Sequence, residues 1–137
     1  MQTELAGKRI VIMEDEAIAL MSLRKICFKA GMEVVGVAVN GKDGVEIALR
    51  EKPDIVMTDI SMPVMNGIEA ALQILDQLPV CMVFLSAHVE EAALHKVAKL
   101  GIHGYLLKPI SAFDLIPALA VAYENCQQGK TLADQIP

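Results

Sequence analysis

The sequence has little of what a membrane-spanning or secreted protein needs. Although 54% of its 137 residues are hydrophobic, no uninterrupted apolar stretch approaches the length of about 20 residues that a helix needs to cross a bilayer. Residues 1–9 include Glu4, Lys8 and Arg9 and lack the apolar core of a signal peptide. The sequence therefore predicts a cytoplasmic protein that does not bind a membrane.

Positive charge is also scarce. Twelve Lys and Arg residues stand against seventeen Asp and Glu residues, which leaves a formal net charge of −5. No basic stripe interrupts this balance, and attraction to a nucleic-acid backbone depends on clustered positive charge. The composition therefore argues against direct nucleic-acid binding by this chain.

Cysteine and histidine are few and widely spaced. The three cysteines are odd in number and lie mostly within apolar patterns, which argues against a disulfide framework or a zinc site and favours buried reduced thiols. They are Cys27, Cys81 and Cys126. The three histidines show no metal-ligand pairing, such as two His residues four positions apart that flank a Glu. They are His88, His95 and His103. We therefore expect no transition-metal site.

What the sequence does contain is an alternation of short apolar runs with segments of helical periodicity. The predicted strands cover residues 8–13, 33–39, 55–58, 80–85 and 104–107. The predicted helices cover residues 18–28, 42–52, 67–78, 89–100 and 112–125. Strict alternation, with strands that are apolar throughout, predicts a doubly wound α/β fold in which helices cover both faces of a parallel sheet.

Polar side chains stand at or just beyond the carboxyl ends of four predicted strands. They are Glu14 and Asp15, Asp59, Ser86, and Lys108. Taken singly, each has a simpler explanation, such as a helix N-terminal acid, a turn cap, a strand-end hydroxyl or a solvated amine. Because ligands of open α/β sheets bind outside the carboxyl ends of the strands, their joint placement predicts a functional site.

The residue types at this edge suit phosphoryl transfer. Three carboxylates in one place repel one another unless a divalent cation neutralises them, and oxygen ligands favour Mg²⁺ over zinc. Lys108 would add positive charge, and the Ser86 hydroxyl could donate to a phosphoryl oxygen. Asp59, on the central strand, is the candidate nucleophile and would become an aspartyl phosphate.

With these residues at these positions, the sequence resembles the receiver domains of two-component response regulators. The resemblance covers about residues 7–125 and leaves residues 126–137 as a C-terminal tail or the start of a linker. It rests on five segments in order: Glu14-Asp15, Asp59-Ile60-Ser61-Met62-Pro63, Asn66-Gly67, Ser86-Ala87, and Tyr105-Leu106-Leu107-Lys108-Pro109. The fold that it implies is the flavodoxin-like receiver fold, with five parallel strands in the order 2-1-3-4-5.

The resemblance also implies roles for the site residues. Asp59 would accept a phosphoryl group from a histidine kinase or a phosphotransfer protein. Glu14, Asp15, Asp59 and the carbonyl of Ser61 would hold Mg²⁺, and no organic cofactor is implied. Such a protein is not an enzyme with a separate substrate, because it catalyses only its own phosphorylation and dephosphorylation. Since Glu14 stands where Asp is also common in the family, its longer side chain could bind the metal through water.

The same resemblance implies a conformational switch. Ser86 and Lys108 would hold the phosphoryl oxygens, and Pro109 would follow a cis peptide bond. Ser86 and Tyr105 would move together on phosphorylation and change an output surface formed by Tyr105 and the helices over residues 89–100 and 112–125. An output domain or a target protein would bind there, and a homodimer could form through the last helices.

Two other classes of function stay open at this stage. A magnesium-dependent phosphohydrolase of the haloacid dehalogenase type would need a second Asp two residues after the nucleophile, where this chain has Ser61. A receiver-like docking module would work without phosphorylation. Residues 108–124 also look like receivers of antitermination regulators, although residues 126–137 do not supply the RNA-binding module of those proteins.

Overall fold

Strands and helices alternate along the chain as the apolar runs predict. The computed structural model describes residues 4–87 and 97–135. Most of the predicted helix over residues 89–100, together with His88 and His95, lies outside these residues. Every other predicted element is present, with bounds that differ by at most two residues. Within the described ranges, no helix is long and apolar enough to cross a membrane.

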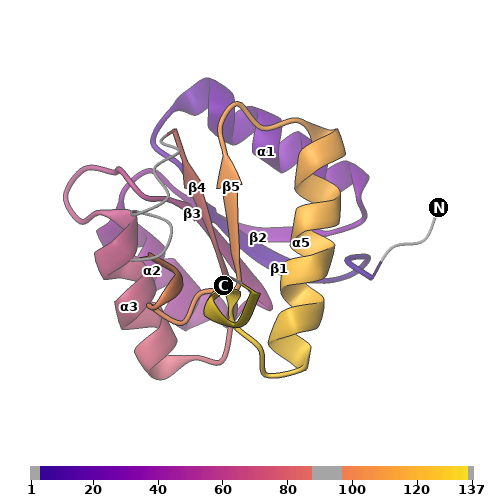
Figure 1. The fold of residues 1–137 in the computed structure, drawn as a ribbon. Helices are drawn as coiled ribbons and strands as arrows, with labels where there is room; N and C mark the ends of the chain where they lie inside the picture. The colour runs from indigo at the N-terminus through magenta and orange to yellow at the C-terminus, as the bar shows by residue number, and fades with distance from the viewer. Residues whose placement is uncertain (1–3, 88–96, 136–137) are drawn as a thin grey trace.

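The five strands form one parallel sheet (Figure 1). They are β1 (Arg9–Met13), β2 (Glu33–Ala38), β3 (Ile55–Asp59), β4 (Cys81–Ser86) and β5 (Gly104–Leu107). Their order across the sheet is β2-β1-β3-β4-β5, and all four strand pairs are parallel. The doubly wound fold and the strand order are therefore confirmed.

Helices cover both faces of this sheet. The described helices are α1 (Ala17–Lys29), α2 (Gly41–Glu51), α3 (Gly67–Gln77) and α5 (Ala112–Gln127). Figure 1 shows α1 and α5 on one side of the sheet and α2 and α3 on the other. Side chains of α1 and α5 share one apolar cluster with Ile10 and Ile12 of β1, whereas those of α2 and α3 share another with Val11 and Met13. Because successive strand residues point to opposite faces, a strand between two helical layers must be apolar at every position.

Polar side chains define where several helices begin. Asn40, Asn66 and Ser111 precede α2, α3 and α5, and each accepts a hydrogen bond from the backbone N–H three residues later. Such a bond satisfies an N–H group that has no partner within the helix. The cap at Asn66 places the start of α3 directly after the loop that follows Asp59.

The chain after α5 folds back on the domain. A 3₁₀ helix spans Leu132–Gln135, and the backbone N–H of Leu132 donates to the carbonyl of Ile102 over 2.7 Å. The side chain of Leu132 packs against the α2 and α3 cluster. The predicted division of the chain at residue 125 stays a prediction, but part of the segment beyond it contacts the core.

Candidate functional site

Three carboxylates meet at the carboxyl edge of the sheet. Glu14 and Asp15 follow β1, and Asp59 is the last residue of the neighbouring strand β3. One carboxylate oxygen from each residue lies within 4.8 Å of the other two. Glu14 is fully buried and Asp59 is nearly so, whereas Asp15 is exposed. The structure thus brings together the three predicted acidic residues in distinct environments.

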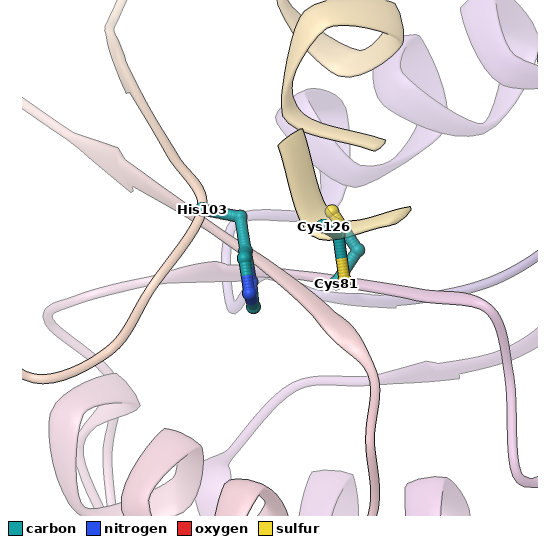
Figure 2. Close-up of side chains that lie close together, drawn as sticks. All are labelled: Cys81, His103 and Cys126. Atoms are coloured by element: carbon teal, nitrogen blue, oxygen red, sulfur yellow. The ribbon is translucent and has the colours of Figure 1, made fainter. Parts of the chain in front are cut away.

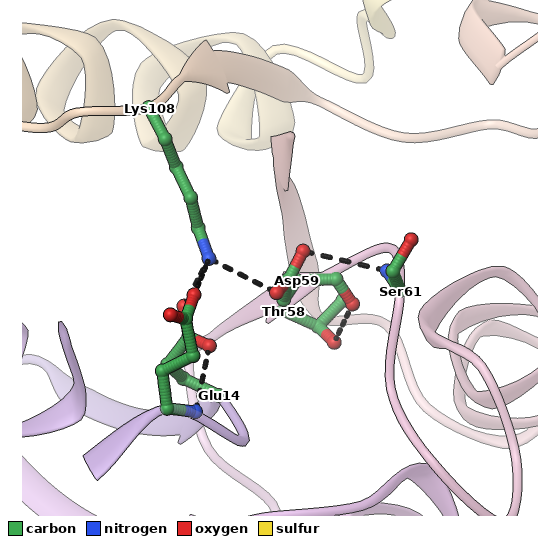
Figure 3. Close-up of polar contacts among 6 residues, drawn as sticks. Glu14, Thr58, Asp59, Ser61 and Lys108 are labelled. Carbon is green, nitrogen blue, oxygen red and sulfur yellow. Dashed lines mark hydrogen bonds and ion pairs between the residues drawn. The ribbon is translucent and has the colours of Figure 1, made fainter. Parts of the chain in front are cut away.

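The ammonium of Lys108 lies between two of these carboxylates (Figure 3). Its Nζ donates to Oε1 of Glu14 over 2.5 Å and to Oδ2 of Asp59 over 3.0 Å. The backbone N–H of Lys108 also donates to the carbonyl of Ser86 over 2.8 Å, which continues the pairing of β4 with β5. As predicted, the Lys108–Pro109 peptide bond is cis.

Glu16 is a neighbour of this ion pair that the sequence prediction left out of the site. Its backbone N–H donates to Oε2 of Glu14 over 3.1 Å, and its exposed carboxylate lies 3.6 Å from Nζ of Lys108. The run Glu14-Asp15-Glu16 was the available signal. Sequence alone did not separate the acid that points inward from those that face solvent.

Burial and pairing shift the ionisation of the two central groups. Burial raises the pKa of Glu14, although hydrogen bonds from Lys108 and the backbone of Glu16 oppose this shift. Burial acts in the other direction on Lys108, but its hydrogen bonds to Glu14 and Asp59 outweigh burial and raise the pKa of the ammonium. Lys108 therefore stays positively charged at neutral pH beside Asp59.

The backbone around Asp59 is held on several sides. The hydroxyl of Thr58 donates to the carbonyl of Asp59 over 2.9 Å, and the N–H of Ser61 lies 3.4 Å from Oδ1 of Asp59. Gly67, the first residue of α3, donates its N–H to the carbonyl of Ile60 over 2.7 Å. A Cβ atom at Gly67 would lie only 2.0 Å from the carbonyl oxygen of Asp59. Glycine at this position therefore lets α3 begin directly against the end of β3.

A cavity lies next to Asp15 and to Ile60 and Ser61, the two residues that follow Asp59. This shallow cavity of about 540 Å³ is lined by Asp15, Ser61 and Asn66, among others. The two exposed predicted metal ligands, Asp15 and Ser61, thus face the same space. The donors gathered here are oxygen atoms, and three of them are carboxylates, which suits Mg²⁺ and does not suit a soft metal.

The two predicted switch residues lie on neighbouring strands. Ser86 is the last residue of β4 and is buried. Tyr105 lies on β5 opposite Phe84 of β4, and its half-buried side chain packs against the α2 and α3 cluster. Ser86 thus lies at the carboxyl edge of the sheet, and Tyr105 lies on the neighbouring strand. Their movement stays a prediction.

Comparisons with known proteins agree with this arrangement. The family model of the response regulator receiver domain matches residues 10–120. The chain is 35% identical over 129 residues to the transcriptional regulatory protein PdtaR of Mycobacterium tuberculosis, and this alignment covers 94% of this chain and 63% of PdtaR. It is 40% identical over 114 residues to the chemotaxis protein CheY of Thermotoga maritima, and this alignment covers 82% of this chain and 95% of CheY.

A solved structure shows the same fold. The REC domain of AraT, a response regulator from Geobacillus stearothermophilus, matches with a TM-score of 0.78 and 30% identity. The match covers 89% of this chain and 97% of that domain. Sequence and structure therefore agree, and this chain belongs to the response regulator receiver domain family.

Proposed function

We propose that this chain is a phosphorylation-controlled signalling switch in which Asp59 accepts a phosphoryl group from a histidine kinase or a phosphotransfer protein. The observation that carries this proposal is the position of Asp59, a nearly buried carboxylate 3.0 Å from the ammonium of Lys108 and within 4.8 Å of the Glu14 and Asp15 carboxylates. A carboxylate in such a place is a nucleophile with a fixed cation next to it.

The transfer itself needs few groups from the protein. A carboxylate oxygen of Asp59 would form a bond to phosphorus while the bond from phosphorus to the donor nitrogen breaks, which leaves an acyl phosphate on Asp59. Negative charge would concentrate on the phosphoryl oxygens during this step, and Lys108 would offset part of it. The hydroxyl of Ser86, at the end of the adjacent strand β4, would bind a phosphoryl oxygen.

Mg²⁺ is the proposed cofactor, with Glu14, Asp15, Asp59 and the carbonyl of Ser61 as ligands. The carboxylate oxygens of the three acidic residues lie within 4.8 Å of one another, and the donor set is made of oxygen. A bound Mg²⁺ would neutralise the carboxylates and the incoming phosphoryl oxygens. Lys108 already pairs with Glu14 and Asp59, so the exposed Asp15 is the proposed entry point for the cation.

The proposed output surface comprises Tyr105, α5 and the segment over residues 89–100. On α5 the large apolar side chains of Phe113 and Val121 are exposed, which suits binding to another protein. An output domain, a target protein or a second copy of this chain would bind there after Ser86 and Tyr105 rearrange. The chain spans 63% of PdtaR, a transcriptional regulatory protein, so a transcriptional output is a further proposal by similarity.

Phosphorylation of a small donor tests the proposal directly. Wild-type protein and Asp59→Asn would be incubated with Mg²⁺ and acetyl phosphate, and the intact mass would be read by mass spectrometry. We expect one phosphoryl adduct on the wild type and none on Asp59→Asn. Asp76→Asn is the matched control, because Asp76 is an exposed residue of α3 and its variant should react as the wild type does.

Two results would count against the proposal. An equal adduct on Asp59→Asn would place the acceptor elsewhere. A folded wild-type protein that gains no adduct would favour the phosphorylation-independent docking module.

A further inference from the structure

A second group of reactive side chains lies at the opposite edge of the sheet (Figure 2). Cys81 is the first residue of β4, His103 directly precedes β5, and Cys126 lies in the last turn of α5. One sulfur or nitrogen atom from each residue lies within 4.8 Å of the other two. Since a strand rises about 3.3 Å per residue, β4 separates this group from Ser86 and the phosphoacceptor edge.

The two thiols lie in unequal environments. Cys81 is fully buried, whereas Cys126 is only partly buried. The prediction of buried thiols is therefore confirmed for Cys27 and Cys81 and wrong for Cys126. Cys126 and His103 line a cavity of about 830 Å³, which gives a small molecule a route to the Cys126 sulfur.

The exposure of the two thiols separates a candidate nucleophile, Cys126, from its buried partner, Cys81. The nearby Cys81 thiol lowers the pKa of Cys126, although burial opposes this shift. The nearby Cys126 thiol and burial both raise the pKa of Cys81. Because Cys126 is also the thiol that lines the cavity, it is the one placed to react as a thiolate, which is the reactive form of cysteine.

His103 argues for thiol chemistry over metal binding. Its Nδ1 accepts a hydrogen bond of 3.0 Å from the backbone N–H of Met82, and burial lowers its pKa. The ring is thus neutral with its proton on Nε2, so neither nitrogen offers a free lone pair to a metal ion. Figure 2 shows both thiols on the same side of the imidazole, with the sulfur atoms within 4.8 Å of each other.

We propose that Cys126 and Cys81 form a thiol redox site that reacts with hydroperoxides and closes to a disulfide within one chain. In the first step the Cys126 sulfur attacks a peroxide oxygen, an S–O bond forms and the O–O bond breaks. The departing oxygen takes up the proton that the Cys126 thiol released and leaves as an alcohol, or as water when the oxidant is hydrogen peroxide. Cys126 is now a sulfenic acid.

The second step uses Cys81. Its sulfur attacks the sulfenic sulfur of Cys126, an S–S bond forms and the S–O bond breaks. The hydroxyl group leaves with the Cys81 proton as water. In total, two electrons pass from the thiol pair to the peroxide bond. Cys81 is buried, but its sulfur lies within 4.8 Å of the Cys126 sulfur, so it needs no access to solvent for this step.

The disulfide would join the last turn of α5 to the start of β4. The exposed apolar residues Phe113 and Val121 lie on the same helix, so oxidation would restrain one end of the proposed output helix. The redox chemistry itself requires no phosphorylation of Asp59, and either proposal can fail without the other.

The test is peroxide oxidation of the full chain after treatment with EDTA. Free thiols would be counted by alkylation and intact mass, and linked peptides would be mapped without reduction. We expect the free thiols per chain to fall from three to one, with a Cys81–Cys126 peptide that dithiothreitol separates. Cys27 is the internal control, since it is fully buried and burial raises its pKa to about 12.

Variants separate the roles of the two residues. Cys27→Ser should leave the linked peptide unchanged, and Cys126→Ser should abolish it. Cys81→Ser should accumulate a sulfenic acid on Cys126 that dimedone traps. If a Cys81 variant fails to fold, the wild-type protein still tests whether Cys126 is the reactive thiol. In the wild type, iodoacetamide should alkylate Cys126 at least about tenfold faster than Cys27.

Three results would overturn the inference. One is disulfide formation only between chains, and another is modification of Cys27 as fast as that of Cys126. The third is binding of one Zn²⁺ per chain that protects both Cys81 and Cys126 from alkylation, which would identify a metal site instead.

Discussion

The ammonium of Lys108 donates a hydrogen bond of 2.5 Å to Oε1 of Glu14, a carboxylate with no exposed surface, across 94 residues of sequence. Lys108 follows β5 at one side of the sheet and Glu14 follows β1, with β3 and β4 between these strands. The long side chain of Lys108 thus spans the carboxyl edge and meets Asp59 on the way. The same Lys108 ammonium therefore contributes to the stability of the fold and to the charge environment of Asp59.

Removal of the Lys108 charge should destabilise the protein. Lys108→Met leaves the carboxylates of Glu14 and Asp59 without their ammonium, and loss of one partner of a largely buried ion pair costs about 3 kcal/mol. The free energy of unfolding at pH 7, measured with urea in the absence of divalent cations, checks this expectation. Lys25→Met is the control, because Lys25 is exposed on α1. Equal stability of the two variants would contradict the prediction.

Neutralisation of Glu14 should have a pH-dependent effect. Burial raises the pKa of Glu14 above its ordinary value of 4.5, so the folded protein holds this proton more tightly than the unfolded chain does. Ionisation of Glu14 therefore costs stability at pH values above its folded pKa, and this cost disappears as the pH falls through the folded pKa to 4.5.

Glu14→Gln keeps an oxygen acceptor for Lys108 and removes the charge. We expect this variant to be more stable than the wild type at pH 7, with a difference that shrinks as the pH approaches 4.5. Urea unfolding at several pH values, without divalent cations, measures the difference. Glu16→Gln, at an exposed position, should show little change. A Glu14→Gln difference that grows toward acid pH would refute the argument.

A methyl group at Gly67 should disturb Asp59 without touching its side chain. The added Cβ would lie 2.0 Å from the carbonyl oxygen of Asp59, so α3 or the end of β3 must shift. We expect Gly67→Ala to lose about 1–3 kcal/mol of stability and to react more slowly with acetyl phosphate. Gly104→Ala is the control, because its Cβ would lie 3.1 Å from the Ala122 side chain and away from the site. If Gly67→Ala reacts with acetyl phosphate as fast as the wild type, the predicted disturbance of Asp59 is ruled out.

Much of the fold followed from local patterns in the sequence. Strands that lie between two helical layers are apolar at every position, whereas the helices that alternate with them along the sequence repeat their apolar residues at helical spacing. These two patterns predicted the elements and their parallel arrangement. Polar residues at strand ends, such as Asp59 and Lys108, could be assigned to one edge of the sheet, because the carboxyl ends of parallel strands lie at the same edge. The order of the strands came from the resemblance, since periodicity does not distinguish one arrangement of parallel strands from another.

The tertiary structure alone decided which side chains touch. Glu14, Asp15 and Glu16 are alike in sequence, yet only Glu14 is buried, and its carboxylate is the one of the three that accepts a hydrogen bond from Lys108. Cys81 and Cys126 looked unrelated, yet the packing of α5 on the sheet brings their sulfur atoms together. Such contacts depend on how crossover helices bring distant segments together and on which direction each side chain takes. Hydrophobic periodicity records the face of an element, and it carries no information on the partner that this face meets.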